Sequence, residues 1–358
     1  MIIAIEEARK GEGRVAPNPP VGCVILDKDY KLISKGHHSE YGNDHAEISA
    51  LNNLSDHKLL MGAHLVVTLE PCAHVGKTPS CAQTLSKLPL ASVTYGLMDP
   101  NPLVMGKGAE ILKSTGIAVI CYNELIPELE ELIEIFTFNK ANNSPFVTLK
   151  VATSLDGQMA LASGESKWIT GTASRQHAHF LRAKHSAVLI GRGTFEMDDP
   201  LLNIRHDNFK DIKNKVILFD PMGKTIENLP SSNLYKHHEP QDIFVISLSK
   251  KTPPKGITLV KPIMQNGRID LKLLLKDLYQ RDIFSILVEG GANTFVDFIK
   301  QNAAQRLSLF IAPSIIGASG GLSWSQSLEI SSLDQKIGLK CLQSRPLGED
   351  ILLAGLFA

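Results

Sequence analysis

The sequence has few cysteines, no net charge and no apolar run of membrane-spanning length. Five cysteines among 358 residues form an odd, sparse set that argues against a disulfide-stapled secreted protein. Lysine plus arginine equals aspartate plus glutamate at 37 each, and no basic tract would follow the phosphates of a nucleic acid. The short, charged start does not resemble a signal peptide. We therefore expect a cytoplasmic protein that acts on a small molecule, away from membranes and nucleic acids.

What the sequence does contain is a pattern of potential metal ligands. His45 and Glu47 are separated by one residue, Cys72 follows a proline, and Cys81 lies nine positions further on. The order H-x-E…P-C…C is that of zinc-dependent deaminases, in which one histidine and two cysteines bind the metal and the glutamate does not. Three protein ligands leave a fourth position for water, as in catalytic zinc sites. Glu47 is then the general acid and base.

Two structural interpretations of these residues stay open. A closed structural zinc site needs a fourth ligand, which His74 could supply, but Glu47 would then have no role. A disulfide between Cys72 and Cys81 needs an oxidising compartment, which the cysteine content does not suggest. A helix expected over 79–87 instead places Cys81 near a helix N-terminus, which favours the thiolate form.

Strands alternate with helices in the first part of the chain, which predicts a layered α/β/α domain. Strands are expected over 21–26, 31–36, 63–70, 91–97 and 117–121. Helices are expected over 1–11, 45–54, 79–87, 105–116 and 124–139. Cys72 follows the buried strand at 63–70, and such folds place ligands at the carboxyl ends of strands.

A polar segment at 141–145 ends in proline and is expected to link two domains, 1–141 and 146–358. In the second domain, strands are expected over 146–155, 186–191, 216–220, 242–248, 257–260, 284–291, 306–313 and 349–357. Helices are expected there over 172–183, 271–279 and 293–301. The sequence shows no internal repeat and no low-complexity segment.

Glycines in the second domain do not form the usual dinucleotide fingerprint. G-x-G-x-x-G is missing after its first strand. Glycine-containing turns do occur at the ends of two expected strands, at 191–194 and 289–294. Each could present backbone N–H groups and a helix N-terminus to a phosphate, or could be an ordinary tight turn.

Motifs along nearly the full chain resemble the bifunctional deaminase/reductase family of riboflavin biosynthesis. In the first domain they are PNPPVGCV at 17–24, GHH at 36–38, HAE at 45–47, LEPCAHVGKTPSC at 69–81 and DPNP at 99–102. In the second they are LKVATSLDG at 149–157, SGESKWIT at 163–170, LRA at 181–183, GRGTFEMDDPLLNIR at 191–205 and VEGG at 288–291. Nucleoside deaminases usually have two residues between the cysteines, whereas this family and this chain have eight.

The resemblance implies a cytidine-deaminase-like α/β/α domain at 1–141 and a dihydrofolate-reductase-like α/β domain at 146–358. One Zn²⁺ per chain and NADPH are the implied cofactors. The first implied reaction is hydrolytic deamination of 2,5-diamino-6-(5-phosphoribosylamino)pyrimidin-4(3H)-one. The second is reduction of the ribosyl group to a ribityl chain. The resemblance also suggests a homo-oligomer.

The resemblance assigns the deaminase site residue by residue. The implied zinc ligands are His45, Cys72 and Cys81, with Glu47 as the proton carrier. The implied substrate contacts are Asn18, His38, His74 and Lys77. A lysine is a compact point charge that suits the phosphate of the substrate, although a surface lysine can equally be solvated.

For the reductase, the implied NADPH contacts are Ala152, Trp168, Thr194, Asp198 and Gly291. The implied substrate contacts are Ser166, Arg182, Leu202, Arg205 and Glu289. Lys150 and Asp156 occupy family-like positions without a firm role. Two alternatives remain: Trp168 could be core packing, and Arg205 could brace its loop by pairing with Asp198 or Asp199.

The chain departs from the family pattern in two places. Its N-terminal helix is several residues shorter than usual. Pro221 also stands where the family often has a small polar residue, and proline has no backbone N–H to donate to a cofactor.

Two other functions compete with the riboflavin enzyme. A nucleoside or nucleic-acid deaminase with an accessory domain predicts a two-residue gap between the cysteines and a basic face. A non-enzymatic zinc-stabilised binding protein predicts a fourth protein ligand and no need for Glu47.

Overall fold

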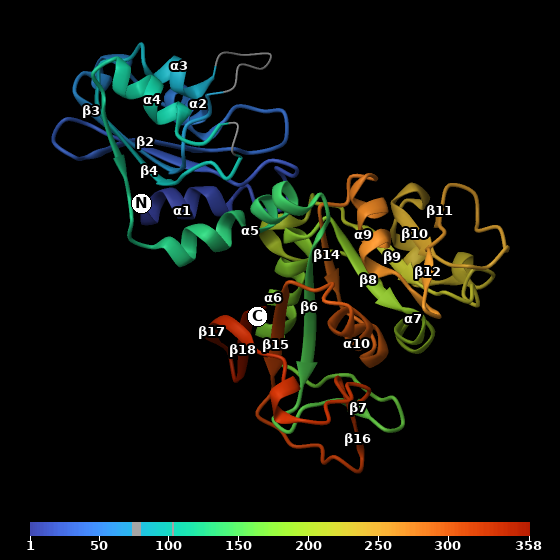
Figure 1. Ribbon diagram of the computed structural model, residues 1–358. Helices are drawn as coiled ribbons and strands as arrows, with labels where there is room; N and C mark the ends of the chain where they lie inside the picture. The colour runs from blue at the N-terminus through green and yellow to red at the C-terminus, as the bar shows by residue number, and fades with distance from the viewer. Residues whose placement is uncertain (74–79, 102–103) are drawn as a thin grey trace. The chain divides into compact units, whose positions relative to one another are not determined.

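The computed structural model describes residues 1–73, 80–101 and 104–358 (Figure 1). The chain divides into two compact units, Met1–Asn143 and Ser144–Ala358. Within the described residues, no helix combines the length and apolar character needed to span a membrane.

The described part of the first unit is built on a five-stranded sheet in the order β2-β1-β3-β4-β5. Its strands are β1 (Gly22–Leu26), β2 (Leu32–His37), β3 (Ala63–Leu69), β4 (Leu90–Leu97) and β5 (Ala118–Cys121). Strand β1 runs antiparallel to β2 and β3, whereas β3, β4 and β5 are parallel. Leu69 and Leu97, the last residues of β3 and β4, are paired, so the segments that follow these strands begin side by side.

Helices cover this sheet in two groups. The helices are α1 (Ile2–Arg9), α2 (Ala46–Asn52), α3 (Cys81–Leu85), α4 (Lys107–Ser114) and α5 (Ile126–Asn142), with a 3₁₀ turn at His57–Leu60. Buried residues of α2, α3 and α4 share one apolar cluster with the sheet, and those of α1 and α5 share another. This layering confirms the predicted α/β/α class.

The second unit contains a nine-stranded sheet in the order β11-β10-β9-β8-β14-β6-β15-β18-β17. Its strands are β6 (Phe146–Thr153), β8 (Ala187–Gly191), β9 (Lys215–Phe219), β10 (Ile243–Ile246), β11 (Thr258–Val260), β14 (Ser285–Val288), β15 (Arg306–Ile311), β17 (Leu339–Leu347) and β18 (Asp350–Phe357). Neighbours from β11 to β15 are parallel, and β18 and β17 add an antiparallel edge. Two small sheets pair β7 (Gln158–Leu161) with β16 (Gly321–Ser323), and β12 (Met264–Gln265) with β13 (Arg268–Ile269).

The helices of the second unit pack on this sheet through separate apolar clusters. They are α6 (Thr172–Lys184), α7 (Arg192–Asp198), α8 (Asn233–His237), α9 (Leu271–Tyr279) and α10 (Ala292–Lys300). Single 3₁₀ turns lie at Asp207–Phe209, Leu229–Ser231, Pro240–Asp242 and Leu333–Gln335. Helices α9 and α10 belong to one cluster, α7 and α8 to a second, and α6 to a third. This α/β arrangement agrees with the predicted class of the second domain.

Several elements differ from the sequence-based expectations, and the short elements α8, β7, β12, β13 and β16 were not expected. Helix α5 continues through Asn142, and the N–H of Asn143, in the left-handed region with φ 49°, bonds Asn139 O at 2.9 Å. The first residues of the polar segment at 141–145 therefore form the end of α5, and only the remaining residues link α5 to β6. The turn expected after Gly191 is the start of α7. Strand β17 was missed because its side chains are mostly exposed and carry no apolar alternation.

Candidate active sites

The three potential metal ligands come from three different element ends of the first unit. His45 is the N-cap of α2 and has extended backbone angles. Cys72 lies three residues beyond the end of β3, and Cys81 is the first residue of α3. Ser80 caps that helix by accepting a hydrogen bond from the N–H of Gln83 at 3.2 Å. Helix ends and strand ends thus bring together residues that are up to 36 positions apart in the sequence.

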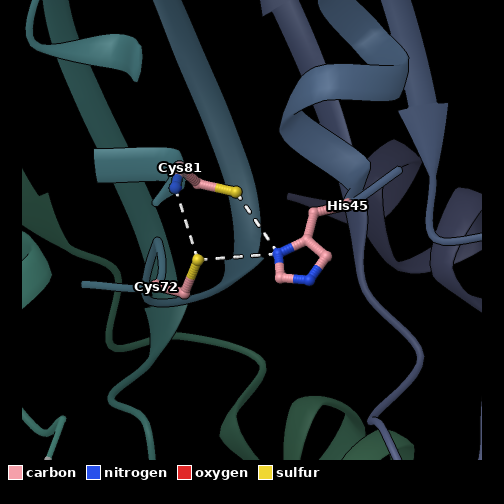
Figure 2. Close-up of side chains that lie close together, drawn as sticks. All are labelled: His45, Cys72 and Cys81. Atoms are coloured by element: carbon pink, nitrogen blue, oxygen red, sulfur yellow. Dashed lines mark hydrogen bonds between the residues drawn. The ribbon is translucent and has the colours of Figure 1, made fainter. Parts of the chain in front are cut away.

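Their ligand atoms converge on one point (Figure 2). Nδ1 of His45 lies 3.3 Å from Sγ of Cys81 and 3.6 Å from Sγ of Cys72. The backbone N–H of Cys81 donates to Sγ of Cys72 at 3.3 Å. All three ligand atoms lie within 4.8 Å of one another.

This geometry fits Zn²⁺. For tetrahedral coordination with ordinary Zn–N and Zn–S lengths, the N···S edge is about 3.6 Å, close to both observed distances. The pKa of the Cys72 thiol is lowered to about 4, first by a hydrogen bond with the Cys81 side chain, so a thiolate is available to a metal. Cys72 and Cys81 are free thiols, which excludes the disulfide alternative here. His74, the alternative fourth ligand, lies outside the described residues.

Glu47 lies in the first turn of α2 and is 3% exposed. Burial raises the pKa of its carboxyl to about 7, and the nearby Cys72 charge contributes in the same direction. A carboxyl that titrates near neutrality can both take up and release a proton at working pH. These properties suit the proton carrier expected from the sequence.

A cavity of about 190 Å³ opens beside the metal ligands. Asn18 and His38 line it, whereas His74 and Lys77, the other expected substrate contacts, lie outside the described residues. Nδ1 of His38 lies 2.9 Å from Asp44 O, and Nε2 lies 3.3 Å from the Asn18 amide nitrogen. Burial lowers the pKa of His38. A neutral ring that donates from Nδ1 and accepts at Nε2 satisfies both contacts.

Several cavity-lining residues were missed by sequence reasoning. They are Glu70, Asp99, Asn101, Phe136 and Lys140. Glu70 directly follows β3, and Asp99 is the second residue after β4. Their position was a usable signal because the two strands are adjacent and parallel. Phe136 and Lys140 belong to the long helix α5, which contains no motif that indicates a site.

A second cavity, of about 490 Å³, lies in the second unit. Every residue expected at the reductase site lines it: Ala152, Ser166, Trp168, Arg182, Thr194, Asp198, Leu202, Arg205, Glu289 and Gly291. Lys150 lines it too, whereas Asp156 does not. Instead, the Asp156 carboxylate accepts hydrogen bonds from the N–H groups of Ile316 at 3.1 Å and Gly317 at 2.7 Å. Asp156 therefore braces the loop after β15.

A buried ion pair lies on the wall of this second cavity. Nε of Arg182 bonds Oε1 of Glu289 at 2.5 Å, and Nη2 bonds Oε2 at 2.9 Å. The two side chains are 14% and 7% exposed. Burial alone would raise the pKa of Glu289, but the Arg182 charge and hydrogen bonds lower it to about 2. Glu289 is thus held as a carboxylate, pre-oriented by a planar bidentate contact.

Arg205 does not brace its loop through the aspartates considered above. Its Nε lies 3.4 Å from Nε2 of His179. Asp199 accepts from the N–H of Asn233 at 2.8 Å, and Asp198 lies 3.8 Å from Nζ of Lys167. Among the described residues Arg205 forms no ion pair with either aspartate, so its charge remains available to the cavity.

Arg175 adds a third arginine that sequence reasoning missed. Positions 175, 179 and 182 recur at helical spacing on α6, so they share one face of that helix. The Arg175 guanidinium lies 4.7 Å from the ring centroid of Trp168. Trp168 itself is 71% exposed, which rules out the core-packing alternative.

The two glycine turns meet at adjacent parallel strands, β8 and β14. Gly191 is the N-cap of α7, and Gly291, with φ 83°, is the N-cap of α10. A Cβ at Gly191 would meet Oγ1 of Thr294 at 2.7 Å, and one at Gly290 would meet Oγ1 of Thr194 at 2.6 Å. Glycine is required at these positions because the two turns approach each other closely, and not because each is an ordinary tight turn. Backbone N–H groups at the start of α10 suit the phosphates of a dinucleotide.

Glu289→Gln should destabilise the second unit, because it leaves the Arg182 charge buried without its partner. We expect the free energy of unfolding to fall by about 3–5 kcal/mol at neutral pH. The Glu289 pKa is about 2 in the folded protein against 4.5 as the reference value. Its stabilisation is therefore complete above about pH 4.5 and disappears as the pH falls toward 2. The variant should lose this part of the pH dependence in urea unfolding.

The matched control is Glu196→Gln, which removes a carboxylate from the exposed pair of Glu196 with Arg192 on α7. Exposed pairs of this kind contribute about 0.3–0.5 kcal/mol. Equal losses in the two variants would contradict a special role for the buried pair.

Comparison with known proteins gives matches along the whole chain. Residues 145–353 match the family described as RibD C-terminal domain, and residues 1–97 match the cytidine and deoxycytidylate deaminase zinc-binding region. Riboflavin biosynthesis protein RibD of Aquifex aeolicus is 36% identical over 99% of this chain and 96% of its own length.

Solved structures agree with that match. RibD of Acinetobacter baumannii, form 1, superposes with a TM-score of 0.84 at 34% identity, over 100% of this chain and 97% of that one. The diaminohydroxyphosphoribosylaminopyrimidine deaminase/5-amino-6-(5-phosphoribosylamino)uracil reductase of Thermotoga maritima gives the same TM-score, identity and coverage.

Proposed function

This chain belongs to the RibD family of riboflavin biosynthesis proteins, and we propose on that basis that its two cavities carry out consecutive reactions. The chain is a bifunctional enzyme, a zinc-dependent deaminase joined to an NADPH-dependent reductase. The substrate of the first reaction is 2,5-diamino-6-(5-phosphoribosylamino)pyrimidin-4(3H)-one, and the second reaction reduces its ribosyl group. The observation that carries this proposal is the convergence of His45, Cys72 and Cys81 beside the buried Glu47.

In the deaminase unit, His45, Cys72 and Cys81 would hold Zn²⁺. Bound zinc would supply the Lewis acidity that makes water nucleophilic near neutral pH. Glu47 takes a proton from that water and returns it to the departing amine, which its pKa of about 7 permits. Asn18 and the neutral His38 present polar groups to the pyrimidine from the cavity wall.

In the reductase unit, the start of α10 and the residues around Thr194 would bind NADPH, which supplies the hydride for C1′ of the sugar. Arg182 and Glu289 form a fixed polar wall against which the substrate can be oriented. Arg205, for which the described residues show no ion pair, lines this cavity and would bind the substrate phosphate. Lys150 is half-buried, interacts electrostatically with Glu289 and lines the same cavity.

Arg205→Ala should impair reduction and leave deamination normal. Because Arg205 would bind the substrate in both ground and transition states, the loss should appear mainly in KM. A charge-assisted hydrogen bond contributes about 1.5–3 kcal/mol, so we expect KM to rise about ten- to a hundred-fold. Steady-state NADPH oxidation with the deaminated substrate measures this. Arg192→Ala, an exposed change on α7, is the control and should leave KM unchanged.

The chain also fits a cytoplasmic enzyme that works on free small molecules. Its zero net charge favours a small-molecule substrate over nucleic acid, and its free cysteines suit a reducing compartment. We propose a homo-oligomer by analogy with the family, to be measured by analytical ultracentrifugation.

One assay tests the proposal against its alternatives. The phosphorylated diaminopyrimidine should release ammonia first and then support NADPH oxidation by the same protein. Deamination of cytidine or single-stranded DNA in preference to this substrate would favour a nucleoside or nucleic-acid deaminase. Zinc binding without ammonia release from any of these would favour a non-enzymatic zinc protein.

A further inference from the structure

Glu70 is a buried carboxylate that the proposed mechanism does not use. It follows the last residue of β3, lies two residues before Cys72, and is 3% exposed. Its Oε2 accepts hydrogen bonds from the N–H groups of Asp99 at 3.3 Å and Gly106 at 3.0 Å, and its Oε1 accepts from Ala109 at 3.2 Å. One side chain therefore ties the end of β3 to the segment after β4 and to the start of α4.

Gly108 provides independent evidence of the same close approach. A Cβ at this position would lie 1.9 Å from the carbonyl oxygen of Pro71 and 3.3 Å from Oε1 of Glu70. The first turn of α4 is thus pressed against the segment that leads to the metal ligand Cys72. A negative charge at a helix N-terminus, where Glu70 lies, is also electrostatically favourable.

The segment that Glu70 holds carries two side chains into the deaminase cavity. Asp99 and Asn101 both line it, together with Glu70 itself. The Asp99 carboxylate accepts the N–H of Asn101 at 2.8 Å, so the backbone contact to Glu70 and the cavity-lining side chains belong to one small turn. Moving this turn would change the wall of a cavity of about 190 Å³.

We propose that Glu70 is a positioning residue for the deaminase substrate, acting through Asp99 and Asn101. The proposal rests on the deaminase activity proposed above. Glu70 sets where the wall of the cavity stands relative to the metal ligands, whereas Glu47 and the three ligands perform the chemistry. A loosened wall weakens the binding of ground state and transition state alike, and a loss of that kind raises KM more than it lowers kcat.

Glu70→Gln is the first test, because it keeps the size of the side chain and replaces one acceptor oxygen by a donor. We expect KM for deamination to rise about ten-fold or more, with kcat within about three-fold of wild type. Zinc content and NADPH oxidation of the deaminated substrate should be unchanged. Hydrogen exchange should show faster exchange of the Asp99, Gly106 and Ala109 amides.

Glu110→Gln is the matched control. It removes a carboxylate from the same first turn of α4, where Glu110 is exposed and lies outside the cavity lining. A general effect of charge on helix stability would appear in both variants, but the change in KM is expected only for Glu70→Gln.

A double-mutant cycle separates positioning from mere stabilisation. If Glu70 acts through Asn101, the effects of Glu70→Gln and Asn101→Ala on KM should be strongly non-additive. Additive effects, or a KM within two-fold of wild type in Glu70→Gln with zinc retained, would overturn the proposal. If Glu70→Gln does not fold, Glu70→Asp, which keeps the charge with a shorter reach, must show the same rise in KM. Failure of the wild type to release ammonia would instead reject the deaminase function.

Discussion

Glu47→Gln should retain zinc and the fold but lose deaminase turnover by about 10²- to 10⁴-fold. The amide has the size of the carboxyl and cannot carry a proton between water and the leaving amine. Glu47 is buried beside the three metal ligands, and its pKa of about 7 is the property that the amide lacks. Initial rates of ammonia release, with zinc measured by atomic absorption on the same sample, test this expectation.

Two internal controls accompany the Glu47 experiment. Glu40→Gln removes an exposed carboxylate from the same unit and should leave the rate unchanged. NADPH oxidation by Glu47→Gln with the deaminated substrate should match wild type, because every residue expected at the reductase cavity belongs to the second unit. Normal ammonia release by Glu47→Gln would show that another group carries the proton. Loss of both activities in a folded variant would show that the two sites depend on each other.

Cys81→Ser should release most of the zinc and abolish deamination. A serine hydroxyl stays protonated near neutral pH, so two ligands, His45 and Cys72, would remain for the metal. Zinc content, measured by atomic absorption, and initial rates of ammonia release test the two expected losses.

Cys121→Ser is the control for this second variant, since Cys121 is an exposed free cysteine in the same unit. Its zinc content should equal that of wild type. Full zinc occupancy in Cys81→Ser would remove Cys81 from the ligand set and reopen the question of which residue completes it.

The metal ligands were predictable because zinc binds few residue types and because their order along the chain, H-x-E…P-C…C, is typical of zinc-dependent deaminases. The strands were predictable because buried β-strands such as β8 and β14 are continuous apolar runs. Strand β17 is not a buried apolar run. Its side chains are mostly exposed, and its pairing with β18 is interrupted by a bulge in which Cys341 has φ 52°.

The walls of the two cavities were harder to predict without the family resemblance. Glu70 and Arg175 are ordinary charged residues in the sequence, and their roles arise from neighbours that the folded chain supplies. Glu70 gains its partners because β3 and β4 are adjacent and parallel. Arg175 gains Trp168 from the loop before its own helix. Neither of these pairs of neighbours can be recognised from the amino-acid sequence alone.

The five free thiols also make the protein easy to label. Cys121 is exposed in the first unit and Cys341 is exposed in the second, whereas Cys23 and Cys81 are buried. In the zinc-loaded enzyme Cys72 would be shielded by its metal, which leaves one accessible thiol for each unit. A donor and an acceptor dye attached there would report by energy transfer whether the units move when NADPH or the pyrimidine binds, with no cysteine added or removed.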